Sequence, residues 1–139
     1  MKKTIKFLAF TIICVLLTSC AGSGMGQDLW GTATYKENKE FGSGEKTISV
    51  AVSVLENLVT FKINTDKEML GDALIEHNLI SGENGPYGLY VKVVNGITAD
   101  YDINQSYWSL SKDGEYLQTG VDVTEISDGE HYELTYTKL

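Results

Sequence analysis

Two Asx-Gly dipeptides set the strongest constraint on how this chain can fold. Asn95-Gly96 and Asp113-Gly114 each lie between two short apolar runs. Both dipeptides accept positive φ at the two central positions, which a type I′ hairpin turn requires. The stretch 93–121 therefore predicts two β-hairpins, joined by an acidic corner at residues 100–105. In the first hairpin, the expected strands are 89–94 and 97–101.

Alternating apolar residues predict three further strands. Residues 46–55 place valine and isoleucine on one face and small polar residues on the other, which is the pattern of a half-buried strand. A second strand over 59–63 pairs back after a turn at Glu56-Asn57. A last strand is expected around 132–136. The glycine-rich stretch 82–88 is expected to be a loop.

A capping box predicts one helix. Thr65 can accept a hydrogen bond from the amide of Glu68, while Glu68 reaches back to the amide of Thr65. The helix is expected over 66–78, with one face made by Leu70, Ala73, Leu74 and His77. The expected fold is α+β, with one helix packed on a mostly antiparallel sheet with β-hairpins.

The N-terminal residues predict a bacterial lipoprotein signal. Residues 1–6 are basic, and 7–17 form an apolar run too short to span a bilayer. Leu17-Thr18-Ser19-Cys20 resembles a lipobox, which implies diacylglycerol on the Cys20 sulfur, cleavage before Cys20 and a place on the extracytoplasmic face of the cell membrane. The alternative is an ordinary secretory signal with a chance cysteine.

The expected organisation is a signal peptide (1–19), a flexible tether (20–45) and one domain (46–139). Glycine, serine and charged residues dominate the tether. Its aromatic residues are unusual for a tether, and they are expected to pack loosely on the domain or on nothing. The alternative is a short partner-binding segment. These residues are Trp30, Tyr35 and Phe41.

Charge argues against nucleic acid as a partner. The 139-residue chain has a formal net charge of −8 and no arginine. Removing the three lysines of residues 1–19 leaves eight lysines against nineteen acids, a net charge of −11. A basic footprint for phosphates is therefore missing. The chain also lacks the serine-hydrolase and zinc-protease motifs, so no enzyme activity is expected.

Short pieces between residues 87 and 129 carry a family resemblance. They are Tyr87-Gly88-Leu89-Tyr90-Val91, Val94-Asn95-Gly96-Ile97, Ala99-Asp100-Tyr101-Asp102, Tyr107-Trp108, Asp113-Gly114-Glu115-Tyr116, Thr119-Gly120-Val121, Ile126 and Asp128-Gly129. Together they resemble a domain family of secreted and lipid-anchored Gram-positive proteins. That family is similar to the C-terminal domain of transcobalamin and intrinsic factor. The resemblance implies a β-grasp-like fold and a cobalamin-type ligand.

By analogy with those carriers, six residues would face the ligand. Tyr107, Trp108 and the Asp113-Gly114 turn would lie at the binding face, with Tyr87 and Tyr90 nearby. Flat aromatic and backbone groups suit a large amphipathic ring. The alternative is that Trp108 and its neighbours belong to the core.

The acidic corner offers a candidate calcium site. Asp100, Asp102 and Asn104 alternate along the chain, and oxygen side chains can converge on a hard cation. Many relatives carry a fuller acidic loop. Gln105 and Ser111 stand where an EF-hand needs glycine and glutamate, so that specific loop is excluded. The alternative is a polar corner between hairpins.

These features together predict a membrane-anchored ligand-binding lipoprotein that captures cobalamin or a related small molecule for uptake. Its expected partners are the membrane, a small-molecule ligand and a transporter or surface protein. The alternatives are calcium or other cation binding and a surface protein-interaction or adhesion module.

Overall fold

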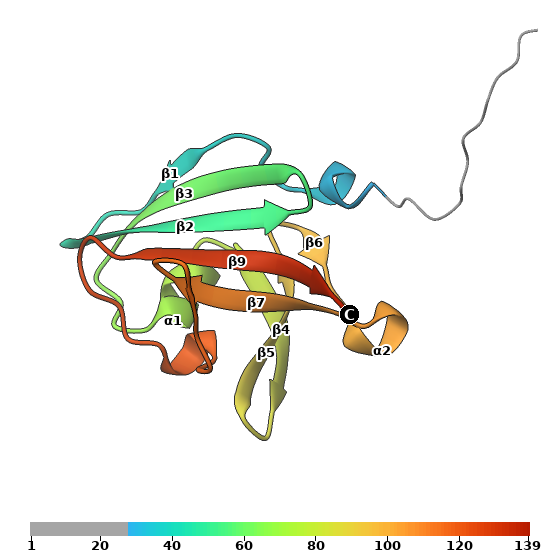
Figure 1. Ribbon diagram of the computed structural model, residues 1–139. Helices are drawn as coiled ribbons and strands as arrows, with labels where there is room; N and C mark the ends of the chain where they lie inside the picture. The colour runs from blue at the N-terminus through green and yellow to red at the C-terminus, as the bar shows by residue number, and fades with distance from the viewer. Residues whose placement is uncertain (1–27) are drawn as a thin grey trace, which may run out of the picture.

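The computed structural model describes residues 28–139 (Figure 1). The predicted signal peptide, Cys20 and residues 20–27 of the expected tether lie outside the described residues. The elements follow in this order: η1 (Leu29–Thr32), β1 (Lys39–Phe41), β2 (Lys46–Val54), β3 (Asn57–Thr65), α1 (Leu70–Ile75), β4 (Ile80–Gly85), β5 (Gly88–Val94), β6 (Ile97–Thr98), α2 (Tyr101–Asn104), β7 (Ser106–Lys112), β8 (Glu115–Tyr116), η2 (Val121–Val123) and β9 (His131–Lys138).

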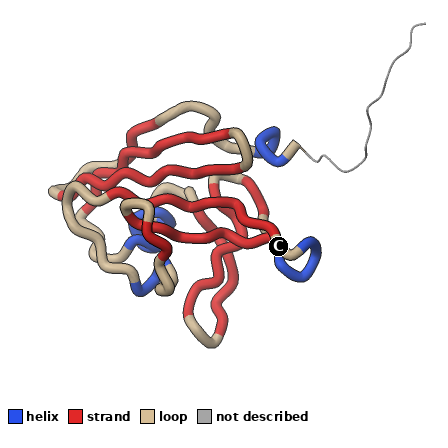
Figure 2. Tube along the Cα trace, in the orientation of Figure 1, coloured by secondary structure: helices blue, strands red, loops and turns tan. Residues whose placement is uncertain are grey.

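Two sheets organise the domain. The larger has the order β1-β3-β2-β9-β7-β8, and the smaller has the order β4-β5-β6. Most neighbours are antiparallel hairpins, but β1 pairs with β3 and β2 pairs with β9 in parallel. With its two small helices, the chain has an α+β architecture (Figure 2). In the described part, no helix is both long enough and apolar enough to cross a bilayer.

Apolar and polar residues alternate along β2 and β3, so one face of the large sheet is buried, as the sequence predicts. The inward residues of β2 and β3 are at most 1% exposed. They include Val50, Val52 and Phe61, and they join Leu134 of β9 in one core. The small polar residues between them lie on the other, half-exposed face. Burying such apolar surface is the main favourable term in folding.

Both predicted hairpin turns are confirmed. Asn95 and Gly96 have φ of 51° and 79°, and Asp113 and Gly114 have φ of 51° and 84°. These left-handed values suit a type I′ turn. The strand after Asn95-Gly96 is shorter than expected, because β6 ends at Thr98 and Tyr101 begins α2.

The predicted helix is too long at both ends. Thr65 extends β3 by pairing with Lys46, and its Oγ1 accepts from the amide of Lys67 at 3.0 Å, so no capping box forms. The helix begins at Leu70 and ends at Ile75. Its end is fixed by Asn78, which has φ of 56°, while the amide of Leu79 donates to the carbonyl of Leu74 at 3.0 Å. This is a Schellman-type stop.

The stretch 82–88 was wrongly predicted to be a loop. Residues 80–85 form β4, which pairs antiparallel with β5. Figure 1 shows this hairpin projecting from the body of the domain. Gly82 is needed because an added Cβ would lie 1.9 Å from the carbonyl oxygen of Tyr90. The pattern misses β4 because its residues after Ile80 are all exposed and do not alternate.

The expected tether is wrong for residues 28–45, because residues 28–41, here called the N-terminal strap, pack on the domain. β1 joins the edge of the large sheet beside β3. The rings of Tyr35 and Phe41 meet that of Phe61 edge to face, with centroids 5.8 and 5.6 Å away. Trp30 also packs against the core. The packed domain therefore includes the strap.

Asn95 holds the strap from the hairpin turn. Its Oδ1 accepts from the amide of Tyr35 at 2.9 Å, and its Nδ2 donates to the carbonyl of Tyr35 at 2.8 Å. The amide of Thr34 donates to the carbonyl of Asn95 at 2.8 Å. Asn95 is 0% exposed. Its side chain thus pairs with a backbone segment much as a neighbouring strand would.

Candidate functional site

A groove lies between β5 and the segment that follows β7. Its volume is about 360 Å³, and we call it the Trp108 groove. Trp108 and Leu110 of β7 form its apolar floor, while Tyr90 of β5 and Tyr116 of β8 stand at its rim. Tyr90 is 42% exposed and Tyr116 is 64% exposed. Aromatic rims over an apolar floor suit an amphipathic ligand.

Trp108 is held rigidly at this floor. Its ring meets Tyr136 edge to face at 5.8 Å, and its indole Nε1 donates to the carbonyl of Lys92 at 3.1 Å. The residue is 9% exposed. Trp108 therefore belongs to the core, as the alternative interpretation holds, and only part of it borders the groove.

Asp122 anchors the projecting hairpin beside the groove. Its Oδ2 accepts from the amide of Leu89 at 3.1 Å. Gly88 allows this approach, since it has φ of 101° and an added Cβ would lie 2.2 Å from that oxygen. The other carboxylate oxygen, Oδ1, is buried without a partner among the described residues. The groove wall is thereby fixed to η2.

A second hollow of about 450 Å³, the tyrosine hollow, lies next to the acidic corner. It is lined by Tyr90, Lys92, Asp100, Tyr101, Asp102 and Tyr107. Lys92 Nζ lies 3.3 Å from Glu83 Oε1 and 3.9 Å from Asp100 Oδ2. The hydrogen bond to Glu83 raises the pKa of Lys92; burial opposes that rise, and the nearby carboxylates add to it. Lys92 is therefore a cation at neutral pH.

The acidic corner uses its oxygens within its own turn. Asp100 Oδ1 accepts from the amide of Asp102 at 3.0 Å and caps α2. Asn104 Oδ1 accepts from the amide of Ser106 at 3.2 Å and also from its hydroxyl. Within residues 28–139, no group of three or more acidic, histidine or cysteine side chains could hold a metal ion. The assignment of Asp100, Asp102 and Asn104 to a metal ion stays a prediction.

The six predicted ligand residues lie in several places. Tyr90 and Trp108 share the groove, whereas Tyr107 faces the tyrosine hollow. Asp113 and Gly114 lie at the other end of β7, about 20 Å from Tyr107 at the usual rise of a strand. They line a separate hollow of about 250 Å³. Tyr87, at the tip of the β4–β5 hairpin, is 98% exposed. Their assignment to ligand binding stays a prediction.

Sequence reasoning missed the residues across the groove from β5. Residues 116–121 form that wall. Tyr116 follows the Asp113-Gly114 turn, so its alignment with β7 could have been read from the hairpin register. Leu117 gives no such signal, because it lies beyond the two-residue strand β8.

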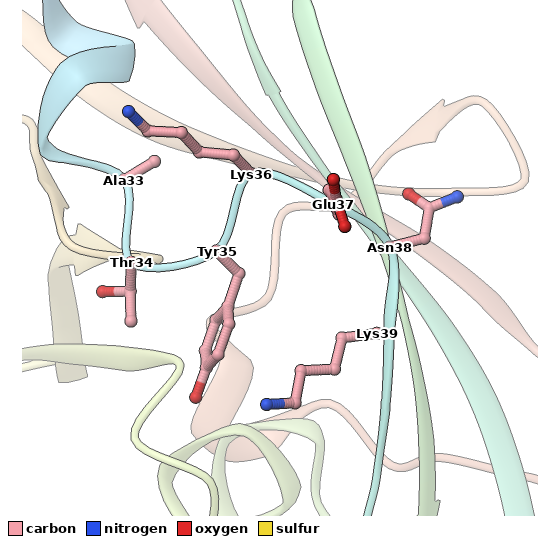
Figure 3. A pocket seen from close by; sticks show the side chains of 7 residues that line it. All are labelled: Ala33, Thr34, Tyr35, Lys36, Glu37, Asn38 and Lys39. Carbon is pink, nitrogen blue, oxygen red and sulfur yellow. The ribbon is translucent and has the colours of Figure 1, made fainter.

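Another hollow of about 440 Å³ lies along the N-terminal strap (Figure 3). Its lining residues, 33–39, are consecutive. Lys39 Nζ lies 4.6 Å from the ring centroid of Tyr35 and 5.4 Å from that of Phe41. Lys39 therefore already has cation–π partners. The hollow is formed by the curved course of residues 33–39 alone.

Residues 68–138 match the model of DUF4430, a domain of unknown function. The chain belongs to the DUF4430 family. These residues contain every element from α1 to β9, and all residues that line the Trp108 groove and the tyrosine hollow lie among them. No curated protein matches the chain.

Two solved structures resemble this DUF4430 chain. A candidate metal-binding protein from Ruminococcus gnavus is 40% identical, with a TM-score of 0.65, over 68% of this chain and 99% of its own. Haptocorrin in complex with Cbi is 19% identical, with a TM-score of 0.55, over 70% of this chain. The chain spans 26% of haptocorrin, and that likeness concerns the fold alone. The transcobalamin-like resemblance is confirmed at this level.

Proposed function

We propose that the protein is a lipid-anchored extracytoplasmic binding protein whose Trp108 groove takes an amphipathic ligand of the cobalamin type. The observation that carries this proposal is the groove itself, with an apolar floor, two tyrosines at the rim and residues 117–121 along the opposite wall. The haptocorrin-like fold supports the ligand class. The β-grasp-like architecture belongs to the same proposal, and β2, β3, α1 and the parallel strand β9 supply its elements.

The groove is open and covers one face of such a ring system. Large ligands are usually buried over most of their surface when binding is tight. We therefore propose weak capture by this chain alone, strengthened when a transporter subunit or another surface protein covers the second face. The β4–β5 hairpin projects from the domain (Figure 1), and its turn residue Tyr87 is 98% exposed, which supports the hairpin as the contact for such a partner.

Cyanocobalamin and cobinamide are expected to bind the purified full chain with saturable one-to-one heat. Tyr116→Ser removes a rim ring that is 64% exposed, so folding is retained. We expect this variant to weaken binding about tenfold, as for an aromatic contact at an interface. Isothermal calorimetry is the measurement, because the ligands absorb where tryptophan fluoresces.

Tyr101→Ser is the matched control, since Tyr101 is 44% exposed and lines the tyrosine hollow instead. Its corrinoid affinity is expected to equal that of the wild type. Absence of heat at high micromolar ligand removes corrinoids as a stand-alone ligand and favours the protein-interaction alternative. Equal weakening by both variants argues against the groove.

Membrane anchoring through Cys20 is the second part of the proposal. The wild-type chain, expressed in a bacterium that processes lipoproteins, is expected in the membrane fraction, because two acyl chains anchor stably. Cys20→Ala is expected to release the protein into the soluble fraction and to abolish labelling by a palmitate analogue. Identical fractionation of the two proteins would refute lipidation at Cys20.

A further inference from the structure

The tyrosine hollow has walls from three separate elements. Tyr90 and Lys92 come from β5, Asp100 and the α2 residues Tyr101 and Asp102 come from the corner, and Tyr107 comes from β7. Tyr90 and Tyr101 are 42% and 44% exposed, so part of each residue is accessible to a ligand. The volume of about 450 Å³ is in the range of small-ligand sites. Three aromatic rings thus border one open space.

The charge of this hollow is negative. Glu83 and Asp100 both lie beside the ammonium of Lys92, at 3.3 and 3.9 Å. Asp102 adds a third carboxylate, and none of the ion pairs found within residues 28–139 involves it. The raised pKa of Lys92 reports the same field, because these carboxylates favour a positive charge at this place. One fixed cation therefore faces three acids, and the excess charge favours a second cation.

The chemistry of the walls selects the kind of cation. A hard metal ion needs six to eight oxygen ligands, and this corner offers few, since Asp100 Oδ1 and Asn104 Oδ1 accept hydrogen bonds within the turn and leave Asp100 Oδ2 and the Asp102 carboxylate. A quaternary ammonium ion needs no such ligands. It is held by the faces of aromatic rings and by the diffuse field of nearby carboxylates. This hollow combines three tyrosine rings with an excess of negative charge.

We propose that the tyrosine hollow binds a small quaternary ammonium ion, with Tyr90, Tyr101 and Tyr107 around its methyl groups and Asp102 supplying unpaired negative charge. This site is separate from the Trp108 groove, although Tyr90 borders both. It extends the proposed function, since the chain would hold a corrinoid-type ligand in the Trp108 groove and an organic cation in the tyrosine hollow.

Choline is the probe, and 3,3-dimethylbutanol is its neutral counterpart with the same shape. The purified full chain is titrated with each by calorimetry. Choline is expected to bind in a saturable manner, and the neutral alcohol at least about tenfold more weakly, because it lacks the charge that rings and carboxylates recognise. Equal affinity for the two ligands, or no choline binding at millimolar concentration, would overturn the proposal.

Variants localise the effect. Tyr101→Ser and Asp102→Asn are exposed changes that are expected to weaken choline binding several-fold each. Lys92→Met, which removes the competing cation, is expected to tighten it. Two controls leave choline affinity unchanged: Tyr116→Ser removes a tyrosine from the other groove, and Glu125→Gln removes an exposed carboxylate outside the hollow. Weakening by the controls to the same degree would mean a nonspecific charge effect and would refute the site.

Two further experiments identify the source of the cation and test whether a metal ion binds at the same place. Vesicles of phosphatidylcholine that compete with choline indicate a lipid headgroup, whereas vesicles without effect indicate a free ammonium compound; both results support the site. Millimolar calcium is expected to leave choline affinity unchanged, and calcium that binds and displaces choline would replace the proposal by a metal site. If choline does not bind, the expected corrinoid binding and its dependence on Tyr116 are unaffected. The two proposals can therefore be refuted independently.

Discussion

Replacing Phe61 by alanine is expected to lower the free energy of unfolding by about 3 to 5 kcal/mol, the usual cost of emptying a buried aromatic site. Phe61 is 0% exposed at the centre of β3. Its ring also meets Tyr35 and Phe41 edge to face, and such pairs add about 0.5 to 1.5 kcal/mol beyond burial. The loss should therefore loosen the strap as well as the sheet.

Urea denaturation followed by circular dichroism measures this loss. Leu58→Ala is the matched control, because Leu58 lies three residues earlier on β3 and is 61% exposed. Its expected effect is below about 0.5 kcal/mol. A Phe61→Ala protein that unfolds within about 1 kcal/mol of the wild type would show that the three rings do not share a packed core.

Replacing Asn95 by alanine is expected to cost about 3 kcal/mol. Two hydrogen bonds to Tyr35 disappear, and each is worth about 1 kcal/mol or more when its partner stays buried. Alanine must also adopt a φ of 51°, a left-handed conformation that costs about 1 kcal/mol outside glycine. The effect is expected to be concentrated on the strap.

Asn95→Gly separates the two contributions, because glycine keeps the left-handed turn while losing the side chain. It should be less destabilised than Asn95→Ala by about 1 kcal/mol. Limited trypsin digestion gives the local measurement, since Lys36 and Lys39 lie in the strap. Cleavage there should accelerate in both variants before the domain unfolds globally. Wild-type rates of cleavage would mean that Asn95 does not hold the strap.

The large sheet could be predicted because its signals are local. Alternation marks Val50 and Val52 as inward residues, and the Asp113-Gly114 turn fixes the hairpin of β7 and β8. The strap could not be predicted, because its strand pairs with residues about twenty positions further along and one of its anchors is a side chain sixty positions away. Local patterns carry no record of such long-range pairing. β4 was missed for a different reason, since its residues after Ile80 are exposed and do not alternate.

The candidate site was predictable only in part, for a geometric reason. Tyr107 and Trp108 are adjacent in sequence, but successive side chains of a strand point to opposite faces. Trp108 therefore faces the core and Tyr107 the other side of β7. Choosing aromatic and acidic residues by type grouped side chains that line different hollows, since Trp108 borders the groove and Tyr107 the tyrosine hollow. Resolving them needed the register of β5, β7 and β8.

The strap also determines how the domain bears mechanical load. A pull on residue 28 reaches η1 first, then the hydrogen bonds between Tyr35 and Asn95, and then the short pairing of β1 with β3. The core strand β2 is loaded only after these contacts have given way. The hydrogen bonds at Asn95 are thus expected to break under tension before the strands that line the Trp108 groove and the tyrosine hollow are disturbed.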